Sequence, residues 1–360
     1  MAAKVLFIAN HRLNRSPGQR FRFEQYLGFL KENGFECTIS NIISEKDDKY
    51  LYSKGNYLKK TLIALKSWWI RLKDLARANE FDIIFIYREA LLTPSTYFES
   101  QFEKSKAKVI FDFDDAIWLD NVSAANKSLS RLKKPSKTNT ILTLADLVFV
   151  GNQYLAEYAL KYNTNVKIVP TTIDTSYHVP AEKQEKDFIT IGWTGTQTTL
   201  KYLKAIETVF IKLKGKYREK LKFKIICDQQ WKSDQVEIEF VKWEKTKEIE
   251  QLQSIDIGIM PLEDDEWSRG KCGFKGLQYM ALEIPAVLSP VGVNTDIINH
   301  SNNGFLANSP SEWIEIISQL IEDEGLRKRM GENARKTIIQ RYSVEAIKED
   351  YLKYFKELLE

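Results

Sequence analysis

Apolar residues occur along this chain in short runs, and each run is followed by a polar segment and then by a stretch of helical period. Such runs are typical of buried parallel strands that alternate with helices. In the first half the predicted strands are residues 4–9, 36–43, 82–87, 108–113, 147–150 and 166–169. In the second half they are residues 188–191, 222–227, 236–240, 257–262 and 286–289. The pattern therefore predicts two α/β halves.

The chain length and one proline-containing polar segment predict how these halves are divided. The 360 residues exceed the ~250–300 at which a single hydrophobic core usually splits. Residues 170–187 hold few apolar side chains, two prolines and no clear period, which is typical of a linker, and we place the linker over 171–187. We therefore predict an N-terminal Rossmann-like domain over 1–170 and a second Rossmann-like domain over 188–340. Residues 341–360 are predicted to form a helix that packs back toward the N-terminal domain.

Composition narrows the class of protein. The formal net charge is only +4, which argues against a nucleic-acid-binding chain. The three cysteines are far apart and the three histidines are scattered, so neither a structural zinc site nor another metal cluster is expected. The first apolar run is too short for a signal peptide, and no run approaches the ~18 residues of a membrane span. These features predict a cytoplasmic protein.

The stretch from residue 257 to residue 294 carries the most chemistry. A strand is followed by the charged segment 263–270, a predicted helix over 271–283, a second strand and a break at Gly292. A helix N-terminus carries a partial positive charge and favours an anion. Lys271 and Lys275 add two charges at the same end, which suits a diphosphate. The alternative is that both are ordinary solvated lysines.

This stretch resembles the donor-site signature of family 4 glycosyltransferases, which have the GT-B fold. The residues that carry the resemblance are Lys275, Gln278, Tyr279, Met280, Ala281, Pro285 and the Ser289–Gly292 turn. The glutamate that binds the donor ribose in the family is Gln278 here, and the first glutamate of its paired motif, expected near Gly270, is missing. The resemblance extends over essentially the whole chain and is strongest over 188–342. It implies an α/β GT-B fold, with two Rossmann-like domains facing a central cleft.

The resemblance also implies an activity. It is that of a retaining hexosyltransferase, which moves a sugar from a nucleoside-diphosphate sugar to a hydroxyl of a glycan or lipid-linked acceptor in the bacterial cell envelope. Lys271, Lys275 and the helix N-terminus would stabilise the charge on the leaving diphosphate. The resemblance implies no bound metal and no other cofactor. A non-catalytic module that binds nucleotide sugars or membranes is an alternative that the change to Gln278 permits.

Further donor contacts are expected in the second half. Gly195 allows close backbone approach after a strand, and Thr196 either caps the next helix or donates to phosphate. The family's usual arginine in this loop is replaced by Trp193, so the phosphate charge is left to Lys271, Lys275 or Arg269. Trp243 is a candidate for stacking on the nucleobase. Its alternative, which we favour, is a place in the core.

The loop after the first strand is basic and contains a Pro-Gly pair. Resemblance to the family implies that Gly18 approaches the donor phosphate and the acceptor. It also implies that Arg20 or Arg22 contacts phosphate or acceptor. The alternative is a solvated basic loop.

The segment 111–116 (FDFDDA) supports two interpretations. Asp114 and Asp115 at a strand end resemble an acidic pair that orients an acceptor hydroxyl in some glycosyltransferases. The segment also resembles the first motif of haloacid-dehalogenase-type magnesium phosphatases, with Asp112 as nucleophile and Asp114 as general acid and base. Against the phosphatase, the motif's threonine position is Ala116. A purely structural alternative is helix capping by Asp115.

Residues 54–79 form the most amphipathic segment of the chain. Its apolar positions step by three and four and form one stripe, Leu58, Leu62, Leu65, Trp69, Leu72 and Ala76. Lys59, Lys66 and Lys73 recur beside the stripe, and Trp68 is adjacent to Trp69. This pattern predicts peripheral binding to an anionic membrane, at the inner face of the plasma membrane. The alternative is a basic surface helix packed on its own domain.

Overall fold

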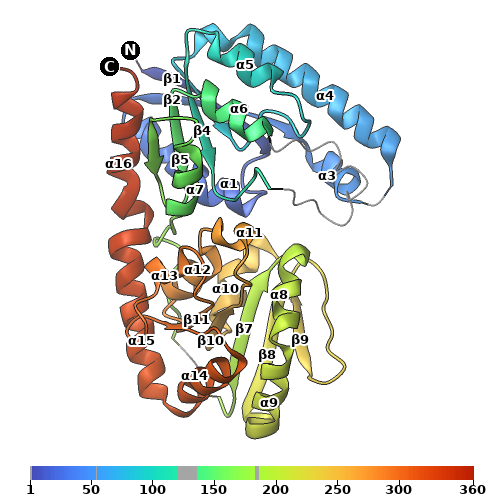
Figure 1. Ribbon diagram of the computed structural model, residues 1–360, viewed down its shortest axis with the longest axis vertical. Coiled ribbons are helices and arrows are strands. Elements are labelled where there is room, and N and C mark those ends of the chain that lie inside the picture. Colours follow the sequence, from blue (N-terminus) through green and yellow to red (C-terminus); the bar gives the residue numbers. More distant parts are fainter. Residues whose placement is uncertain (1, 54, 120–135, 183–185) are drawn as a thin grey trace. The chain divides into compact units, whose positions relative to one another are not determined.

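The computed structural model describes residues 2–53, 55–119, 136–182 and 186–360. It divides into two compact units, here called unit 1 and unit 2. Unit 1 comprises the chain up to Thr171 together with Ile347–Glu360, and unit 2 comprises Thr172–Ala346. Each unit contains one six-stranded sheet (Figure 1), so the predicted pair of α/β halves is confirmed.

The sheet of unit 1 is parallel throughout, in the order β2-β1-β3-β4-β5-β6. Its strands are β1 (Ala3–His11), β2 (Phe35–Ile43), β3 (Ile83–Tyr87), β4 (Lys108–Phe113), β5 (Leu147–Val150) and β6 (Val166–Ile168). All six were predicted, because strands such as β3 and β5 are buried along their whole length and are therefore continuous apolar runs.

Seven α-helices connect the described strands of unit 1. They are α1 (Pro17–Arg22), α2 (Leu27–Glu32), α3 (Glu45–Leu51), α4 (Tyr57–Ala76), α5 (Tyr97–Glu103), α6 (Ser136–Leu144) and α7 (Gln153–Ala159). The predicted loop after the first strand is therefore too long, since it becomes helical at Pro17. Proline at the first helical position fixes a φ that already suits the helix, and its missing N–H is not needed there.

The C-terminal helix α16 (Val344–Glu357) supplies aromatic side chains to the core of unit 1. The Tyr351 ring stacks on Tyr26, with 4.3 Å between their centroids, and the Phe355 ring lies 6.1 Å from Phe85. Phe355 is fully buried. The last residues of the chain thus belong to the same hydrophobic core as its first strand.

The sheet of unit 2 is also parallel, in the order β12-β11-β10-β7-β8-β9. Its strands are β7 (Ile189–Gly195), β8 (Leu221–Cys227), β9 (Ile238–Lys242), β10 (Ile257–Met260), β11 (Ala286–Leu288) and β12 (Phe305–Leu306). The two-residue strand β12 was not predicted, because it is too short to show a period.

The α-helices of unit 2 include several that differ from the prediction. They are α8 (Leu200–Ala205), α9 (Glu207–Tyr217), α10 (Glu248–Gln253), α11 (Glu266–Arg269), α12 (Phe274–Ala281), α13 (Asn294–Ile297), α14 (Pro310–Glu322) and α15 (Glu324–Thr337). The first two of these helices, α8 and α9, meet at Ile206. The charged segment 263–270, expected to be a loop, contains α11. The predicted helix over 271–283 begins only at Phe274.

Part of the predicted linker is packed on unit 2. The backbone N–H of Ile173 donates to the Tyr342 carbonyl at 2.8 Å, and Ile173 pairs with Ser343 as an isolated bridge. His178 is fully buried, and its carbonyl accepts a hydrogen bond from Arg335 at 2.9 Å. Residues 183–185 of the linker lie outside the described residues.

Candidate functional site

In each unit the strand order reverses at one point in the sheet, so the loops that follow the two strands there run to opposite faces. In unit 2 the chain runs from β7 outward to β8 on one side, and β10 pairs with the other side of β7. In unit 1 the same reversal falls between β1 and β3. Open parallel sheets bind ligands at the carboxyl ends of the strands beside such a switch point. Residues that follow β7 and β10, and those that follow β1, β3 and β4, are therefore candidates.

The end of β7 is occupied by a large side chain. Trp193 is 2% exposed, and a Cβ added to Gly195 would lie 2.2 Å from its ring. Gly195 is therefore small because the Trp193 indole packs against it, which differs from the expected approach of a ligand to the glycine backbone. The Lys275 Nζ lies 5.6 Å from the centroid of the same indole ring. Trp193 thus brings the β7 loop and α12 together.

The start of α12 is formed by a glycine in the left-handed region. Gly273 has a φ of +67° and precedes the first helical residue. Lys275 is the second residue of the helix, so its charge adds to the partial positive charge of the helix N-terminus. Lys271 lies in the loop before the helix, with its Nζ 5.3 Å from the Trp267 ring centroid. Lys271 was predicted to lie in the helix over 271–283, and this is wrong, because it precedes α12.

Gln278 lies in α12, one turn after Lys275. It is 2% exposed, and its Nε2 has no hydrogen-bond partner among the described residues. A buried donor without a partner costs about 1–3 kcal/mol, and such groups call for an explanation. An acceptor supplied by a ligand would satisfy it.

The neighbouring Tyr279 fixes α12 to the sheet. Its hydroxyl accepts a hydrogen bond from the Thr194 N–H at 2.9 Å, and a Cβ at Gly258 in β10 would lie 2.4 Å from its ring. Burial raises the pKa of the Tyr279 hydroxyl, so it stays protonated. Tyr279 therefore sets the position of α12 relative to both β7 and β10.

Arg269 is already engaged in an ion pair. Its Nε and Nη2 donate to the two carboxylate oxygens of Asp264 at 2.7 and 3.1 Å, and both side chains are about half exposed. The guanidinium side-chain hydrogen bond lowers the pKa of the Asp264 carboxyl. The backbone of Arg269 also packs closely on Gly292, where a Cβ would lie 2.6 Å from the Arg269 carbonyl oxygen. Asp264 thus competes with any phosphate for Arg269.

The other two candidates of unit 2 lie at strand ends. Thr196 is exposed, and its backbone N–H donates a hydrogen bond to the Thr199 hydroxyl oxygen at 3.2 Å, so it begins the turn before α8. Trp243 follows β9 and is half-buried, with its indole N–H donating to Glu248 at 3.3 Å. The favoured core position for Trp243 is therefore wrong.

In unit 1 the structure brings Gly18, Tyr87, Arg88, Asp114 and Asp115 together; we call these residues the acidic cluster. A Cβ at Gly18 would lie 2.3 Å from the Tyr87 hydroxyl oxygen and 3.1 Å from the Asp114 Oδ2. This close packing explains glycine at the start of α1. Arg88 directly follows β3 and was not among the predicted site residues, because nothing in the local sequence pattern distinguishes it.

Arg88 holds both carboxylates of the acidic cluster. It donates to the Asp114 Oδ1 from Nε and Nη2, at 2.8 and 2.6 Å, and Nη2 also donates to the Asp115 Oδ2 at 2.6 Å. The Tyr87 hydroxyl adds a hydrogen bond to the Asp114 Oδ1 at 3.0 Å. Burial alone would raise the pKa of the Asp114 carboxyl. The charges of Arg88 and Arg22 and these hydrogen bonds outweigh it and lower the pKa.

The two arginines of α1 are buried. Arg20 is 8% exposed, and its guanidinium carbon lies 4.9 Å from the Phe21 ring centroid. Arg22 is 2% exposed and donates to both carboxylate oxygens of Asp112 and to the Val169 carbonyl. The alternative of a solvated basic loop is therefore wrong for these two arginines. The Arg22 guanidinium forms its hydrogen bonds inside unit 1.

The same contact argues against the phosphatase alternative. Asp112 is 1% exposed and its carboxylate is occupied by Arg22. Burial raises the pKa of Asp112, although Arg22 opposes the shift. A nucleophile that attacks a phosphate ester must be accessible, and Asp112 is not. Among residues 2–53, 55–119, 136–182 and 186–360, no group of three or more His, Cys, Asp or Glu could hold a metal ion.

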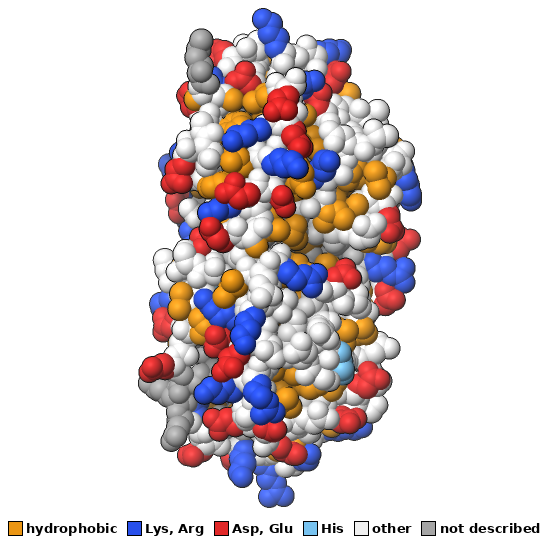
Figure 2. Space-filling model, turned by 90° about the vertical axis from the view of Figure 1, so that its left-hand side faces the viewer, with side chains coloured by type: hydrophobic (Ala, Val, Ile, Leu, Met, Phe, Trp, Pro, Cys, Tyr) orange, Lys and Arg blue, Asp and Glu red, His pale blue; other side chains and the backbone are white. Residues whose placement is uncertain are grey.

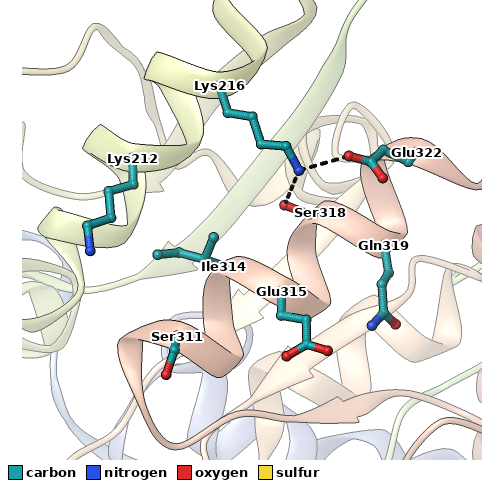
Figure 3. A pocket seen from close by; sticks show the side chains of 8 residues that line it. All are labelled: Lys212, Lys216, Ser311, Ile314, Glu315, Ser318, Gln319 and Glu322. Atoms are coloured by element: carbon teal, nitrogen blue, oxygen red, sulfur yellow. Dashed lines mark hydrogen bonds and ion pairs between the residues drawn. The ribbon is translucent and has the colours of Figure 1, made fainter.

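A hollow lies apart from these candidates, between α9 and α14 (Figure 3). In Figure 3 Lys216 points to Glu322 and Ser318, while Lys212 points away from them. The Lys216 Nζ lies 2.9 Å from the Glu322 carboxylate. Because its charged groups neutralise one another and none of the predicted site residues lines it, we assign no function to this hollow.

A protein-family model matches much of the second half of the chain. Residues 183–337 match the model described as "Glycosyl transferases group 1". The match contains the candidates Gly195, Trp243, Lys275 and Gln278, whereas the acidic cluster lies outside it. A curated relative, glycosyltransferase 1 domain-containing protein 1 of Xenopus tropicalis, is 28% identical over 75 residues. That alignment covers 21% of this chain and only 22% of the relative.

Solved structures match along the whole chain. Sucrose-phosphate synthase from Thermosynechococcus elongatus has a TM-score of 0.73 at 12% identity, with 99% of each chain covered. A glycosyltransferase from Rickettsia africae has a TM-score of 0.69 at 14% identity, with 100% of this chain and 99% of that chain covered. Anabaena HepE, solved with UDP-glucose, has a TM-score of 0.65 at 13% identity, with 98% and 99% covered.

These likenesses establish the fold class. Two parallel six-stranded sheets with helices, together with structural neighbours of this kind, define an α/β GT-B fold with two Rossmann-like domains. At such low identity the structural neighbours show the fold alone. The family match over residues 183–337 adds support for a glycosyl transfer function.

Proposed function

We propose that the protein is a retaining glycosyltransferase of family 4 type. It moves a hexose from a nucleoside-diphosphate sugar to a hydroxyl of a glycan or lipid-linked acceptor during cell-envelope polysaccharide synthesis, on the cytoplasmic side. The observation that carries the proposal is the pairing of Lys275 and Gln278 on α12, beside the switch point of unit 2. Lys275 stands in the first turn of the helix, and Gln278 carries a buried Nε2 without a partner.

The donor is proposed to bind along α12. The diphosphate would lie at the helix N-terminus, where Lys275 and the partial charge of the helix favour an anion. The ribose would lie one turn further on, where its hydroxyl oxygen accepts from the Gln278 Nε2. The class of donor is supported by Anabaena HepE, which has a similar fold and was solved with UDP-glucose. Lys271 is proposed to contribute from the loop before α12, Thr196 from the end of β7 and Trp243 from the end of β9.

The chemical step needs positive charge on the leaving group. The bond between the anomeric carbon and the β-phosphate oxygen breaks, and its electron pair moves to that oxygen. The acceptor oxygen bonds to the same face of the anomeric carbon, and its proton passes to the leaving phosphate oxygen. Lys275 and the start of α12 stabilise the charge as it develops on the diphosphate, which lowers the barrier.

The acidic cluster of unit 1 is proposed to orient the acceptor. The lowered pKa keeps Asp114 ionised at neutral pH, so its carboxylate accepts the hydrogen of an acceptor hydroxyl. Asp115, whose side chain is 23% exposed, is the second acceptor of the pair. Arg88 fixes the direction of both carboxylates. Gly18 leaves the space in which Tyr87 and Asp114 sit.

The proposed reaction uses no bound metal and no other cofactor, because lysines and a helix N-terminus supply the charge. Transfer should therefore continue in the presence of EDTA. A non-catalytic nucleotide-sugar module remains the second candidate, favoured by the neutral Gln278 in place of the usual glutamate. Nucleotide binding without donor hydrolysis or transfer to any acceptor would favour it.

The proposal is tested by a thermal-shift panel of nucleoside diphosphates and their sugars. A ligand at ~100 times its dissociation constant stabilises the native state by ~2.7 kcal/mol. We expect one nucleobase series to raise the melting temperature, with inorganic phosphate as the negative control. An unchanged melting temperature with every nucleotide would contradict the proposal.

A further inference from the structure

The helix α4 packs on unit 1 through its polar side. The residues buried on this helix are Ile63, Ser67 and Arg71. The fully buried Arg71 donates hydrogen bonds to the carbonyls of Ala9 and Ala90, each at 2.8 Å, and forms an ion pair with Asp74 at 2.8 Å. Arg71 therefore anchors the helix to the strand end of β1 and the loop after β3. Lys54, the first residue of the predicted segment, lies outside the described residues.

The opposite side of α4 is apolar and exposed. We call the exposed apolar residues on this side the outer stripe. They are Leu58 (84% exposed), Leu62 (64%), Leu65 (63%), Trp69 (59%) and Leu72 (37%). A surface helix normally turns such a stripe toward the core. The helix is thus packed on unit 1, as the alternative of a basic surface helix expects, but its apolar stripe faces outward and takes no part in that packing. Contiguous exposed apolar side chains of this kind mark an interaction site.

Trp68 is not part of the outer stripe. Its ring stacks on Tyr97 with 5.6 Å between centroids and meets Phe98 edge-on at 4.8 Å. The adjacent tryptophans thus serve different purposes. Trp68 packs α4 against α5, and Trp69 extends outward, with the Lys73 Nζ 5.2 Å from its ring centroid.

Basic residues border the outer stripe. Lys59, Lys66 and Lys73 are spaced by seven residues and so follow one edge of it. The helix carries five Lys and Arg residues against a single Asp. Of these five, Arg71 is buried and paired with that Asp, and Lys66 forms an ion pair with Asp47 of α3 at 2.5 Å. The face drawn in Figure 2, on the side of α16, instead mixes both signs of charge, with its apolar atoms in separate areas. The surface of α4 therefore combines exposed apolar side chains with an excess of positive charge.

We propose that the outer stripe docks unit 1 on an anionic lipid surface. The leucines and Trp69 would enter the headgroup region while the lysines meet lipid phosphates, as in helices that lie in the plane of a membrane. Tryptophan is enriched at this interface. No helix among the described residues is long and apolar enough to cross a membrane, so this contact is with the surface. The inference is independent of the proposed glycosyl transfer.

Vesicle co-sedimentation tests the proposal. The probes are vesicles of phosphatidylcholine alone and of equal parts phosphatidylcholine and phosphatidylglycerol. We expect the wild type to sediment with the anionic vesicles, and less at high salt, because salt screens charge. The triple variant Leu62→Ser, Leu65→Ser, Trp69→Ser should partition at least tenfold less. The matched control Leu160→Ser, Ile339→Ser changes residues 52% and 48% exposed and should bind like the wild type.

Circular dichroism and nucleotide binding show whether the triple variant is folded. If it is not, the difference between the two vesicle compositions with wild-type protein decides the question. Equal binding by the triple variant and the wild type would overturn the proposal, and so would a wild type that stays in the supernatant. A wild-type dimer that dissociates on the triple substitution, without sedimentation, would assign the outer stripe to a second copy of the chain and overturn it as well.

Discussion

Arg88 directs two hydrogen bonds, at 2.6 and 2.8 Å, to a single carboxylate oxygen of Asp114. Arg88 has a φ of +63°, which is unusual for a residue other than glycine. Such a conformation costs of order 1–3 kcal/mol and is concentrated at functional sites. The fold therefore accepts strain at the end of β3 in order to place this guanidinium against Asp114 and Asp115.

The first prediction concerns Arg88→Gln. The change removes the charge that holds the two carboxylates, so the pKa of Asp114 should rise and glycosyl transfer should fall by about tenfold or more. Nucleotide affinity should change little, because the donor residues lie in unit 2. The measurement is transfer rate against pH together with nucleotide titration. Arg77→Gln, in an exposed ion pair with Glu80, is the control and should leave both unchanged. If Arg88→Gln lost nucleotide affinity to the same extent as transfer rate, the role of Arg88 in orienting the acceptor would be contradicted.

The second prediction concerns pH and His11. Burial, with help from Arg15, lowers the pKa of His11 to about 4. The Tyr52 hydroxyl lies 2.9 Å from the His11 Nε2, an arrangement that suits neutral imidazole. The unfolded chain binds the proton near the ordinary His pKa of ~6.5, so it holds more protons than the folded chain between pH 6.5 and about 4. Stability should therefore fall as the pH drops through this window.

This pH effect is measured by chemical denaturation of the wild type and His11→Gln at a series of pH values. The difference in unfolding free energy between the two proteins should shift in favour of the variant as the pH falls from 6.5 to about 4. A constant difference across this range would show that His11 does not titrate as its surroundings predict.

Most of the fold could be predicted from the sequence, because buried parallel strands appear as continuous apolar runs. Continuous apolar runs mark β3 and β5 without any knowledge of their neighbours. The ends of helices were harder to predict, since they depend on tertiary contacts. The start of α12 is delayed to Phe274 because Gly273 takes a positive φ and packs on Ile297, where a Cβ would lie 2.3 Å from the Ile297 Cδ1.

The candidate site divides in the same way. Lys275 and Gln278 lie within one local motif, so the sequence identifies them. Arg88 has no local signal, because its partners come from another strand. The apolar stripe of α4 is evident from its period, but its outward direction is set by Arg71. The acceptors of Arg71 lie on segments far apart in the chain, including Ala9 and Ala90.

The third prediction concerns Gln278→Glu. A carboxylate accepts the two hydroxyl hydrogens of a ribose, and charge-assisted hydrogen bonds are roughly twice as strong as neutral ones. The variant should bind nucleotide at least as well as the wild type. Its ligand-free form should be less stable, since burying a charge is costly. Titration and denaturation measure the two effects, with Gln278→Met as a control that keeps the volume and loses affinity. A large loss of affinity in Gln278→Glu would show that this residue does not face the ribose.

The central claim is that α12 binds the donor diphosphate, and Lys275→Ala tests it most directly. Isothermal titration with UDP and GDP compares the wild type, this variant and Lys328→Ala, which removes an exposed lysine of α15. A hydrogen bond to a charged group contributes about 1.5–3 kcal/mol, so Lys275→Ala should lower the affinity for the nucleotide by about tenfold or more. Lys328→Ala should bind the nucleotide like the wild type. Equal affinities for all three proteins, or no binding of either nucleotide to the wild type, would contradict the account.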